Sequence, residues 1–410
     1  MICSKSPQGI SYAIKQNSED VAFCSLSIRC GTRAEEDLPE GTAHFLEHCL
    51  FKGTKKRSAR CINSCLDRLG GELNAYTTKE EIVLHATVLR QDLHTAVDLL
   101  LDIACNATFP EDEIEIEKGV VLDEIISYKD SPAEDIYDCF ESYFFEGHPL
   151  GRLTLGNRSS IEKATREDLV SFYKKNFIPQ NMALSIVCKS DEKAVEKSLL
   201  KLCSKYFGRL EQIQAPQEKE LAPVESRHFS LRMDKGNHEC NIILGTQAPS
   251  LYEEEDRLCA VLLSNIIGGP AGNSCLNSIL REKHGWVYAA ECSYVQYSDC
   301  GIMAISLGCD KENLGRCLKE TGKILDRLKS KALSERSLKA GKRQLLGQLS
   351  ISACTGETQC LSMGKSLLAF GRVIPDSESI EKLNKISPEQ LRSLCCRLWD
   401  ESRISELIYI

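Results

Sequence analysis

The amino-acid sequence predicts an α+β fold made of two homologous α/β halves. Strand-like segments of β-branched and apolar residues alternate with helical segments, and this order begins again after the middle of the chain. At 410 residues the chain is too long for a single ordinary hydrophobic core. We therefore expect two domains, residues 1–212 and residues 228–410, joined by a linker at 213–227.

Composition and charge are typical of a soluble globular protein. Hydrophobic residues make up 42% of the chain and charged residues 27%, and the formal net charge is −8. A nucleic-acid binder needs a basic face to neutralise phosphates, so this acidic balance argues against that class. No apolar run approaches the roughly 18 residues that cross a bilayer, so we expect no membrane span.

The 21 cysteines are scattered through the chain, and no Cys-x-x-Cys pair occurs. The first residues contain no apolar stretch of the kind that forms a secretory signal. Many thiols without an export signal are typical of a reducing compartment. We therefore expect free cysteines and a cytoplasmic location, unless an export segment was removed ahead of residue 1.

Hydrophobic patterning predicts the elements of the first half. β-Forming residues indicate strands at 10–14 and 21–28, with a turn at 17–20. A helix is expected from about Thr42 to just before Gly53. Further along, we expect a helix at 58–69, strands at 72–77 and 81–89, helices at 91–105, 111–129 and over about ten residues from Pro132, a helix at 162–176 capped by Ser160, and a strand at 182–187.

The second half repeats the opening pattern without three of its polar residues. Strands are expected at 228–233 and 240–246, followed by acidic residues and an apolar helix at 258–267. Gly31-Thr32 recurs as Gly245-Thr246. Counted without gaps, the positions equivalent to His44, Glu47 and His48 are Leu258, Val261 and Leu262. This indicates a duplicated domain whose second copy has lost these polar side chains.

His44, Glu47 and His48 form the pattern His-x-x-Glu-His inside the first predicted helix. Residues i and i+4 of a helix share a face, so the two imidazoles lie side by side with a carboxylate next to them. The pattern is the reverse of His-Glu-x-x-His, and both spacings occur among zinc-peptidase motifs. The sequence therefore predicts a metal site on this helix.

A catalytic zinc site needs a third protein ligand and an open fourth position. On the helix after Pro110, Glu117 and Glu124 are seven residues apart, which is two turns along one face. Glu124 could bind the metal, and Glu117 could support a ligand or the water from behind. Asp123 is an alternative ligand, and an exposed acidic helix without a metal is the alternative explanation.

Together these segments resemble the M16 (pitrilysin-type, inverzincin) metallopeptidases. The resemblance rests on His44–His48 and on the segments Phe51–Thr54, Gly70–Thr77, Gly147–Arg152 and Leu280–Tyr288. The family's third zinc ligand is a glutamate about 76 residues past the second histidine, where Glu124 stands, and Glu117 matches a glutamate that supports activity. Two halves in one chain of this length resemble the M16B subfamily, the group of the mitochondrial processing peptidase β subunit and its bacterial relatives.

This resemblance implies a fold and a reaction. The fold would be two LuxS/metallohydrolase-like halves, each an antiparallel-rich sheet covered by helices, that form a clamshell around a closed chamber. The reaction would be zinc-dependent endopeptidase cleavage of peptides or unfolded polypeptide segments. One Zn²⁺ per chain would be held by His44, His48 and Glu124, and Glu47 would take the proton of the attacking water.

The resemblance also implies how substrate is bound. Asn74, Ala75 and Tyr76 would pair with an extended peptide as an added strand. Arg281 and Tyr288, from the second half, would bind substrate and help to stabilise the oxyanion. For the last two residues, a helix-end salt bridge and a packed tyrosine are the alternative explanations.

Glu134 and Asp138, one turn apart, match positions that recognise a substrate arginine in processing-type members. A solvated acidic face would have the same sequence. Relatives of this size work as dimers, so a homodimer is expected. A non-catalytic scaffold or regulatory subunit of an M16 complex is the alternative function, and metal-dependent hydrolysis of a non-peptide substrate is a third.

Overall fold

The computed structural model describes residues 1–208, 224 and 226–410. The predicted linker at 213–227 lies outside the described residues, apart from Val224 and residues 226–227. All 21 cysteines are free thiols. Among the described residues, we find no helix with the length and apolar character required to span a bilayer.

The chain forms two compact units, and each unit takes residues from both halves of the sequence. Unit 1 comprises Met1–Ile126, Arg152–Lys219 and Ile351–Ile374, and unit 2 comprises Ser127–Gly151, Glu220–Ser350 and Pro375–Ile410. The contiguous domain limits expected from the sequence, 1–212 and 228–410, stay a prediction. Packing groups the residues differently, because one helix from each half joins the other half's sheet.

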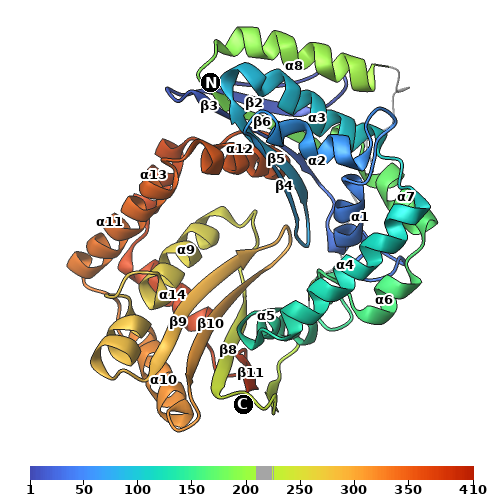
Figure 1. The fold of residues 1–410 in the computed structure, drawn as a ribbon. Coiled ribbons are helices and arrows are strands. Elements are labelled where there is room, and N and C mark those ends of the chain that lie inside the picture. Colours follow the sequence, from blue (N-terminus) through green and yellow to red (C-terminus); the bar gives the residue numbers. More distant parts are fainter. Residues whose placement is uncertain (209–223, 225) are drawn as a thin grey trace. The chain divides into compact units, whose positions relative to one another are not determined.

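Unit 1 is built on a six-stranded mixed sheet in the order β1-β2-β6-β3-β5-β4 (Figure 1). The strands are β1 Ile2–Lys5, β2 Ser11–Gln16, β3 Val21–Ile28, β4 Glu72–Thr77, β5 Ile82–Leu89 and β6 Met182–Cys188. Strands β2 and β6 are parallel, and the other neighbouring pairs are antiparallel. The predicted strands are all present, whereas β1 was not predicted.

Helices cover both faces of the unit 1 sheet. They are α1 Thr42–Leu50, α2 Ala59–Asp67, α3 Leu93–Asn106, α4 Glu111–Lys129 (which runs on into unit 2), α6 Arg158–Lys163, α7 Arg166–Asn176, α8 Glu192–Phe207 and α12 Gly356–Phe370. Alternate residues of β2 enter different cores: Tyr12 and Ile14 pack in the large core with α1, α3 and α8, whereas Ala13 packs against α12. The α12 face is partly polar, since the Ser25 and Ser185 hydroxyls are 2.6 Å apart there.

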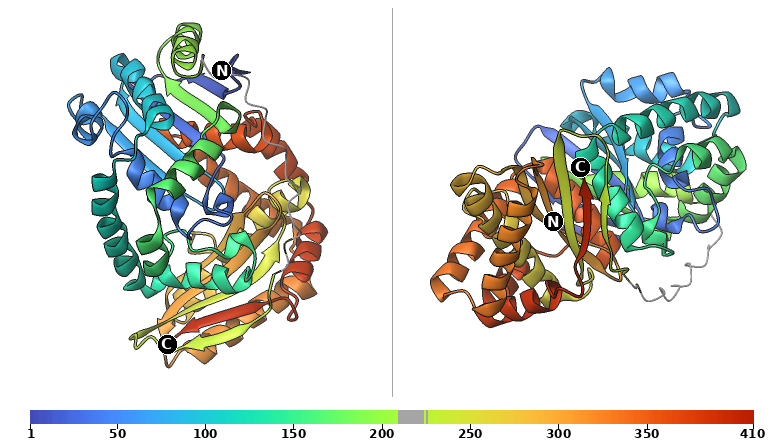
Figure 2. Two further views of the ribbon diagram at one scale, coloured as in Figure 1. Left: turned by 90° about the vertical axis from the view of Figure 1, so that its right-hand side faces the viewer. Right: turned by 90° about the horizontal axis from the view of Figure 1, so that it is seen from below.

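Unit 2 repeats this topology. Its five-stranded sheet has the order β7-β11-β8-β10-β9, with one parallel pair, β7 and β11, as β2 and β6 are in unit 1. Figure 2 shows the red C-terminal strand β11 between the yellow-green strands β7 and β8. The strands are β7 Ser230–Met233, β8 Glu239–Ala248, β9 Val287–Gln296, β10 Gly301–Asp310 and β11 Ser405–Tyr409. The matching order agrees with a duplicated domain.

The helices of unit 2 come from separate parts of the chain. They are α5 Pro132–Phe144, α9 Glu254–Gly268, a π-helix at Asn277–Lys283, α10 Leu314–Ser330, α11 Glu335–Ser352, α13 Asp376–Lys385 and α14 Pro388–Leu398. Helix α5 contacts β8 and β11 of unit 2, and α12 contacts the equivalent strands β3 and β6 of unit 1. Each half of the sequence therefore supplies a helix to the other half's sheet.

The helix predicted at 162–176 was wrong in its bounds. Two helices, α6 and α7, occupy this segment, because Ala164 and Thr165 adopt extended ψ angles of 132° and 163°. Asn157 and Thr165 are the N-caps, and each forms a capping box. Ser160 is the third residue of α6, where its hydroxyl accepts from the Asn157 backbone N–H.

Candidate metal centre

Helix α1 carries His44, Glu47 and His48 against the core of unit 1. Apolar neighbours such as Phe45 and Leu46 are fully buried, so the helix is fixed by packing. His44 is 7% exposed and Glu47 9% exposed. The imidazole rings of His44 and His48 have their centroids 4.6 Å apart at an interplanar angle of 65°. The sequence spacing has therefore placed two ring nitrogens on one face of a buried helix.

Helix α4 brings Glu124 to this face. Glu124 Oε2 lies 3.7 Å from His44 Nε2 and 3.3 Å from His48 Nε2. The three potential ligand atoms all lie within 4.8 Å of one another. In the described part of the chain, these three residues form a group of side chains that could hold a metal ion. Asp123, the alternative ligand, is exposed and is not in the group.

The donor set fits a zinc ion. Zinc binds imidazole nitrogen and carboxylate oxygen at about 2.0–2.2 Å, so two ligands of a tetrahedral site are roughly 3.3–3.5 Å apart. The two separations from Glu124 Oε2 to the imidazole nitrogens are 3.3 and 3.7 Å. Two histidines and one carboxylate also leave a fourth position open, as catalytic zinc sites do. These side chains therefore suit zinc in both their chemistry and their separations.

Glu117 lies behind His48. His48 Nδ1 is 2.8 Å from Glu117 Oε1, so an Nδ1–H donates there and leaves Nε2 free to face Glu124. Glu117 is 4% exposed, and its other oxygen forms an ion pair with Lys52 Nζ. A carboxylate behind a metal-binding histidine fixes its tautomer and its ring orientation. Lys52 extends this support by one residue. The sequence indicated Lys52 only as part of Phe51–Thr54, a segment that resembles the family.

Glu47 is held by the sheet. Thr77 Oγ1, at the end of β4, donates to Glu47 Oε2 at 2.7 Å. Burial raises the pKa of Glu47, although the Thr77 hydrogen bond and the nearby His48 act in the opposite direction. A carboxylate with a raised pKa is suited to accepting and returning a proton near neutral pH. Thr77 was missed as a site residue; the signal was its place at the end of the segment Gly70–Thr77.

The two histidines differ electrostatically. Burial and the neighbouring His48 lower the pKa of His44 to about 4, so its imidazole is neutral at pH 7. Burial also lowers the pKa of His48, but hydrogen bonds to Glu124 and Glu117 outweigh burial and raise it. The hydrogen bond from His48 lowers the pKa of Glu124. The protonated form of His48 and the ionised form of Glu124 therefore favour each other.

Comparisons with known proteins show which family the chain belongs to. The profile described as "Insulinase (Peptidase family M16)" matches residues 12–158, and that described as "Peptidase M16 inactive domain" matches residues 163–345. An uncharacterized zinc protease of Rickettsia felis is 30% identical over 389 residues, which cover 95% of this chain and 92% of the relative. The chain belongs to peptidase family M16.

Further relatives and solved structures agree with this chain in length and fold. An uncharacterized zinc protease of Bacillus subtilis is 27% identical over 397 residues, covering 96% of this chain and 95% of the relative. The crystal structure of a protease from Helicobacter pylori is similar with a TM-score of 0.89 and 18% identity, over 100% of this chain and 98% of that one. The structure of a peptidase M16 inactive domain from Pseudomonas fluorescens is similar with a TM-score of 0.88 and 16% identity. The match covers 100% of this chain and 97% of that one. The predicted α+β class is confirmed: each sheet is mixed, with one parallel pair among antiparallel neighbours.

Asn74, Ala75 and Tyr76 lie in β4, the edge strand of unit 1. Among the described strands, β4 pairs only with β5. Asn74 is exposed, and the Tyr76 ring packs edge-on against His85 with centroids 6.2 Å apart. This M16 chain thus has a strand edge next to Glu47, because Thr77 ends the same strand.

The remaining predicted residues lie in unit 2. Arg281 is exposed on the π-helix, and Tyr288 in β9 is 57% exposed with its hydroxyl donating to Asp310 at 2.9 Å. Glu134 and Asp138 are in α5, where Glu134 is exposed and Asp138 half-buried. They belong to a different compact unit from the metal cluster, and their roles stay predictions.

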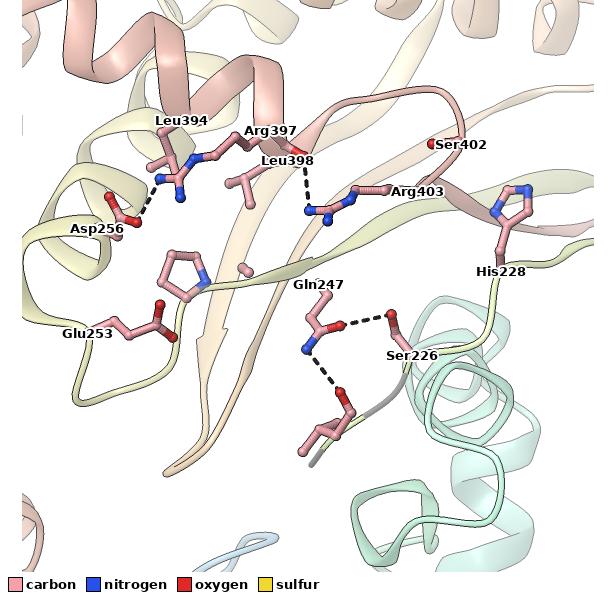
Figure 3. A pocket seen from close by; sticks show the side chains of 13 residues that line it. Ser226, His228, Gln247, Glu253, Asp256, Leu394, Arg397, Leu398, Ser402 and Arg403 are labelled. Atoms are coloured by element: carbon pink, nitrogen blue, oxygen red, sulfur yellow. Dashed lines mark hydrogen bonds and ion pairs between the residues drawn. The ribbon is translucent and has the colours of Figure 1, made fainter. Parts of the chain in front are cut away.

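A cavity of about 600 Å³ lies in unit 2 (Figure 3). Several of its polar and charged groups pair with one another: Arg397 pairs with Asp256 at 2.6 Å, and Gln247 accepts from the Ser226 hydroxyl at 3.1 Å. None of the predicted site residues lines it. The cavity has the size of a ligand site but no converging set of unpaired polar groups, so we assign it no chemistry.

Proposed function

We propose that this protein is a zinc-dependent endopeptidase that hydrolyses peptides or unfolded polypeptide segments. The observation that carries the proposal is the convergence of His44 Nε2, His48 Nε2 and Glu124 Oε2 within 4.8 Å. Glu47 lies on the same buried helix, which supplies a proton acceptor beside the site. The chain's two similar halves and length favour the M16B subfamily, the group of the mitochondrial processing peptidase β subunit.

The residues around the site have distinct tasks. A Zn²⁺ ion held by His44, His48 and Glu124 would activate water and polarise the scissile carbonyl. Glu47 accepts the proton of the attacking water and passes it to the leaving amine. Thr77 holds one oxygen of Glu47 and leaves the other for this proton. Glu117 holds His48 in the tautomer that presents Nε2.

Substrate binds as an added strand. Asn74, Ala75 and Tyr76 present the free edge of β4, which can form backbone hydrogen bonds to an extended peptide. The β4–Thr77–Glu47 contact supports this proposal, because it links the binding edge to the proton acceptor. Arg281 and Tyr288 would bind substrate and stabilise the oxyanion.

Specificity and assembly complete the proposal. Glu134 and Asp138, one turn apart on α5, form a paired carboxylate that suits a substrate arginine. The active unit is a homodimer. The free thiols favour a cytoplasmic location.

The test is cleavage of a mixed peptide library by the natural chain and by Glu47→Gln. We expect both proteins to bind zinc, and cleavage by the variant to fall by roughly 10²–10⁴-fold. Equal cleavage by both would rule out Glu47 as the base. Zinc binding without cleavage by the natural chain would favour the alternative role of a non-catalytic subunit. Equal cleavage of libraries with and without arginine would rule out the role of Glu134 and Asp138.

A further inference from the structure

The N-terminus of α1 is capped by a residue distant from the helix. Its N-cap, Gly41 (φ +86°), has no side chain to satisfy the free amides of the first turn. Instead the Glu35 carboxylate accepts from the backbone N–H of Ala43 at 2.9 Å and of Gly41 at 3.3 Å. A carboxylate here satisfies unpaired amides and faces the positive end of the helix dipole. Glu35 is 0% exposed, so this contact is shielded from water.

Arg152 holds Glu35 in place. Arg152 Nε lies 3.0 Å from Glu35 Oε2, and its two terminal nitrogens donate to the backbone carbonyls of Glu36 and Leu38. One guanidinium therefore binds both the capping carboxylate and the loop that carries it. Arg152 ends the segment Gly147–Arg152, which matches the family but has no role in the proposed reaction.

A second set of contacts fixes the same loop. Glu40 accepts from the Leu153 N–H at 2.7 Å and from the Asn157 amide at 2.9 Å. A Cβ added to Gly41 would lie 2.7 Å from the Cα of Gly156, so the two segments meet backbone to backbone. The loop before α1 is thus bound along its length to residues 152–157.

These contacts around the start of α1 are most important for His44. His48 is held from behind by Glu117, but His44 Nδ1 is buried and, among the described residues, has no hydrogen-bond partner. The direction of the His44 ring therefore depends on its χ angles and on the backbone of the first helical turn. Ala43, whose N–H is bound by Glu35, is the preceding residue. Metal ligands must be held within about 0.5 Å of their working positions.

We propose that Glu35 and Arg152 are positioning residues for the metal centre, which hold the first turn of α1 so that His44 Nε2 faces Glu124. The inference rests on the proposed zinc site. Glu35 would orient His44 as Glu117 orients His48. Glu117 binds the ring nitrogen of His48 directly, whereas Glu35 binds the backbone N–H of the residue before His44. Loss of either residue weakens zinc binding even where the fold survives.

The carboxylate form of Glu35 suits its surroundings, because the three groups around it are all donors. Burial raises the pKa of Glu35 to about 8, while the Ala43 N–H, the Arg152 guanidinium and the Gly41 N–H act against burial. Measurements at pH 8.5, above this value, therefore favour the ionised form of the natural residue.

The experiment is zinc dissociation, measured by chelator competition at pH 8.5, for the natural chain, Glu35→Gln and Arg152→Lys. Glutamine keeps one acceptor but loses the charge. Lysine keeps the charge but has one nitrogen in place of the three guanidinium nitrogens that bind Glu35, Glu36 and Leu38. We expect each variant to raise the zinc Kd about 10–100-fold, the range found for residues behind metal ligands. Asp135→Asn is the control: Asp135 is a half-buried carboxylate of unit 2 that accepts from Tyr409 and Lys235. It should lower the melting temperature and leave the zinc Kd within about twofold.

The outcomes separate the two proposals. If the natural chain binds no stoichiometric zinc, the proposed function fails. If the natural chain binds zinc and both variants bind it as tightly, only the positioning role is overturned. If Glu35→Gln does not fold, Arg152→Lys decides, since it keeps a cation beside Glu35. A change in the visible spectrum of the cobalt-substituted variant, but not of Asp135→Asn, would support a displaced ligand and not a general loss of stability.

Discussion

At the scale of single residues, three glutamates of one site differ because their neighbours differ. Glu124 faces two imidazole nitrogens, Glu117 lies between His48 and Lys52, and Glu47 accepts from a threonine hydroxyl. The same carboxylate thus becomes a candidate ligand, an orienting group or a proton acceptor. Sequence spacing alone left these roles open, and the family resemblance assigned them.

Glu117→Gln should weaken zinc binding. The amide can still accept from His48 but places an NH₂ group against Lys52, so the support behind His48 is lost. We expect the zinc Kd to rise by about 10–100-fold in a chelator competition assay. The matched control is Glu115→Gln on the same helix, because the Glu115 side chain is 70% exposed and forms a surface ion pair with Lys118. Similar Kd values for the two variants would contradict the orienting role.

Thr77→Val should shift the acid limb of the pH–rate profile. The Thr77 hydrogen bond lowers the pKa of Glu47, so its removal raises that pKa further. The base is then ionised only at higher pH, and kcat at neutral pH should fall by about tenfold while zinc remains bound. Thr77→Ser keeps the hydroxyl and should keep the natural profile. An unchanged acid limb in Thr77→Val would show that Thr77 does not act on the base.

At the scale of elements, periodicity predicted most helices and strands but not their partners. The motif helix and β4 were placed correctly, since His-x-x-Glu-His and the alternating strand pattern are local signals. The break between α6 and α7 was not predicted. Thr165 is compatible with a continuous helix in the sequence, and only the structure shows that it caps α7 through a capping box. The ion pairs of Lys52 and Arg152 were also missed, since they depend on which segments meet in space.

Helix α12 should be sensitive to side-chain size at Gly364. A Cβ there would lie 2.8 Å from Ser27 Oγ and 3.3 Å from Ser25 Oγ, so Gly364→Ala must displace either the Ser27 hydroxyl or the helix. We expect unfolding in urea to show a loss of about 1–3 kcal/mol. Gly322→Ala in α10 meets no atom within 4 Å and should gain about 0.5–1 kcal/mol. A stabilising Gly364→Ala would contradict the close packing of α12.

At the scale of the whole molecule, the chain is a duplicated fold with exchanged helices. Both sheets follow the same strand order, and α5 and α12 pack on the sheets of the opposite sequence halves. The duplication was predictable because strand patterns and Gly-Thr pairs recur along the chain. The exchange of helices could not be predicted, because the pattern of an amphipathic helix does not show which of two similar sheets it will cover.

A fragment ending at residue 212 should therefore fail to fold alone. It lacks α12, which covers Ala13, Ala183 and Val187, and its own α5 lacks a sheet. We expect circular dichroism and size-exclusion chromatography to report an unfolded or aggregated fragment. Co-expression with residues 213–410 should restore a compact complex. A stable, monomeric 1–212 fragment would contradict the exchange of helices.

The proposed function requires one zinc ion at His44, His48 and Glu124 for peptide cleavage. The most direct measurement is a zinc titration of the chelator-treated chain that follows the cleavage rate of a peptide. We expect activity to be absent without zinc, to rise linearly and to level off at one equivalent per chain, with no recovery in Glu124→Gln. Full activity after complete zinc removal, or full recovery in Glu124→Gln, would contradict the account.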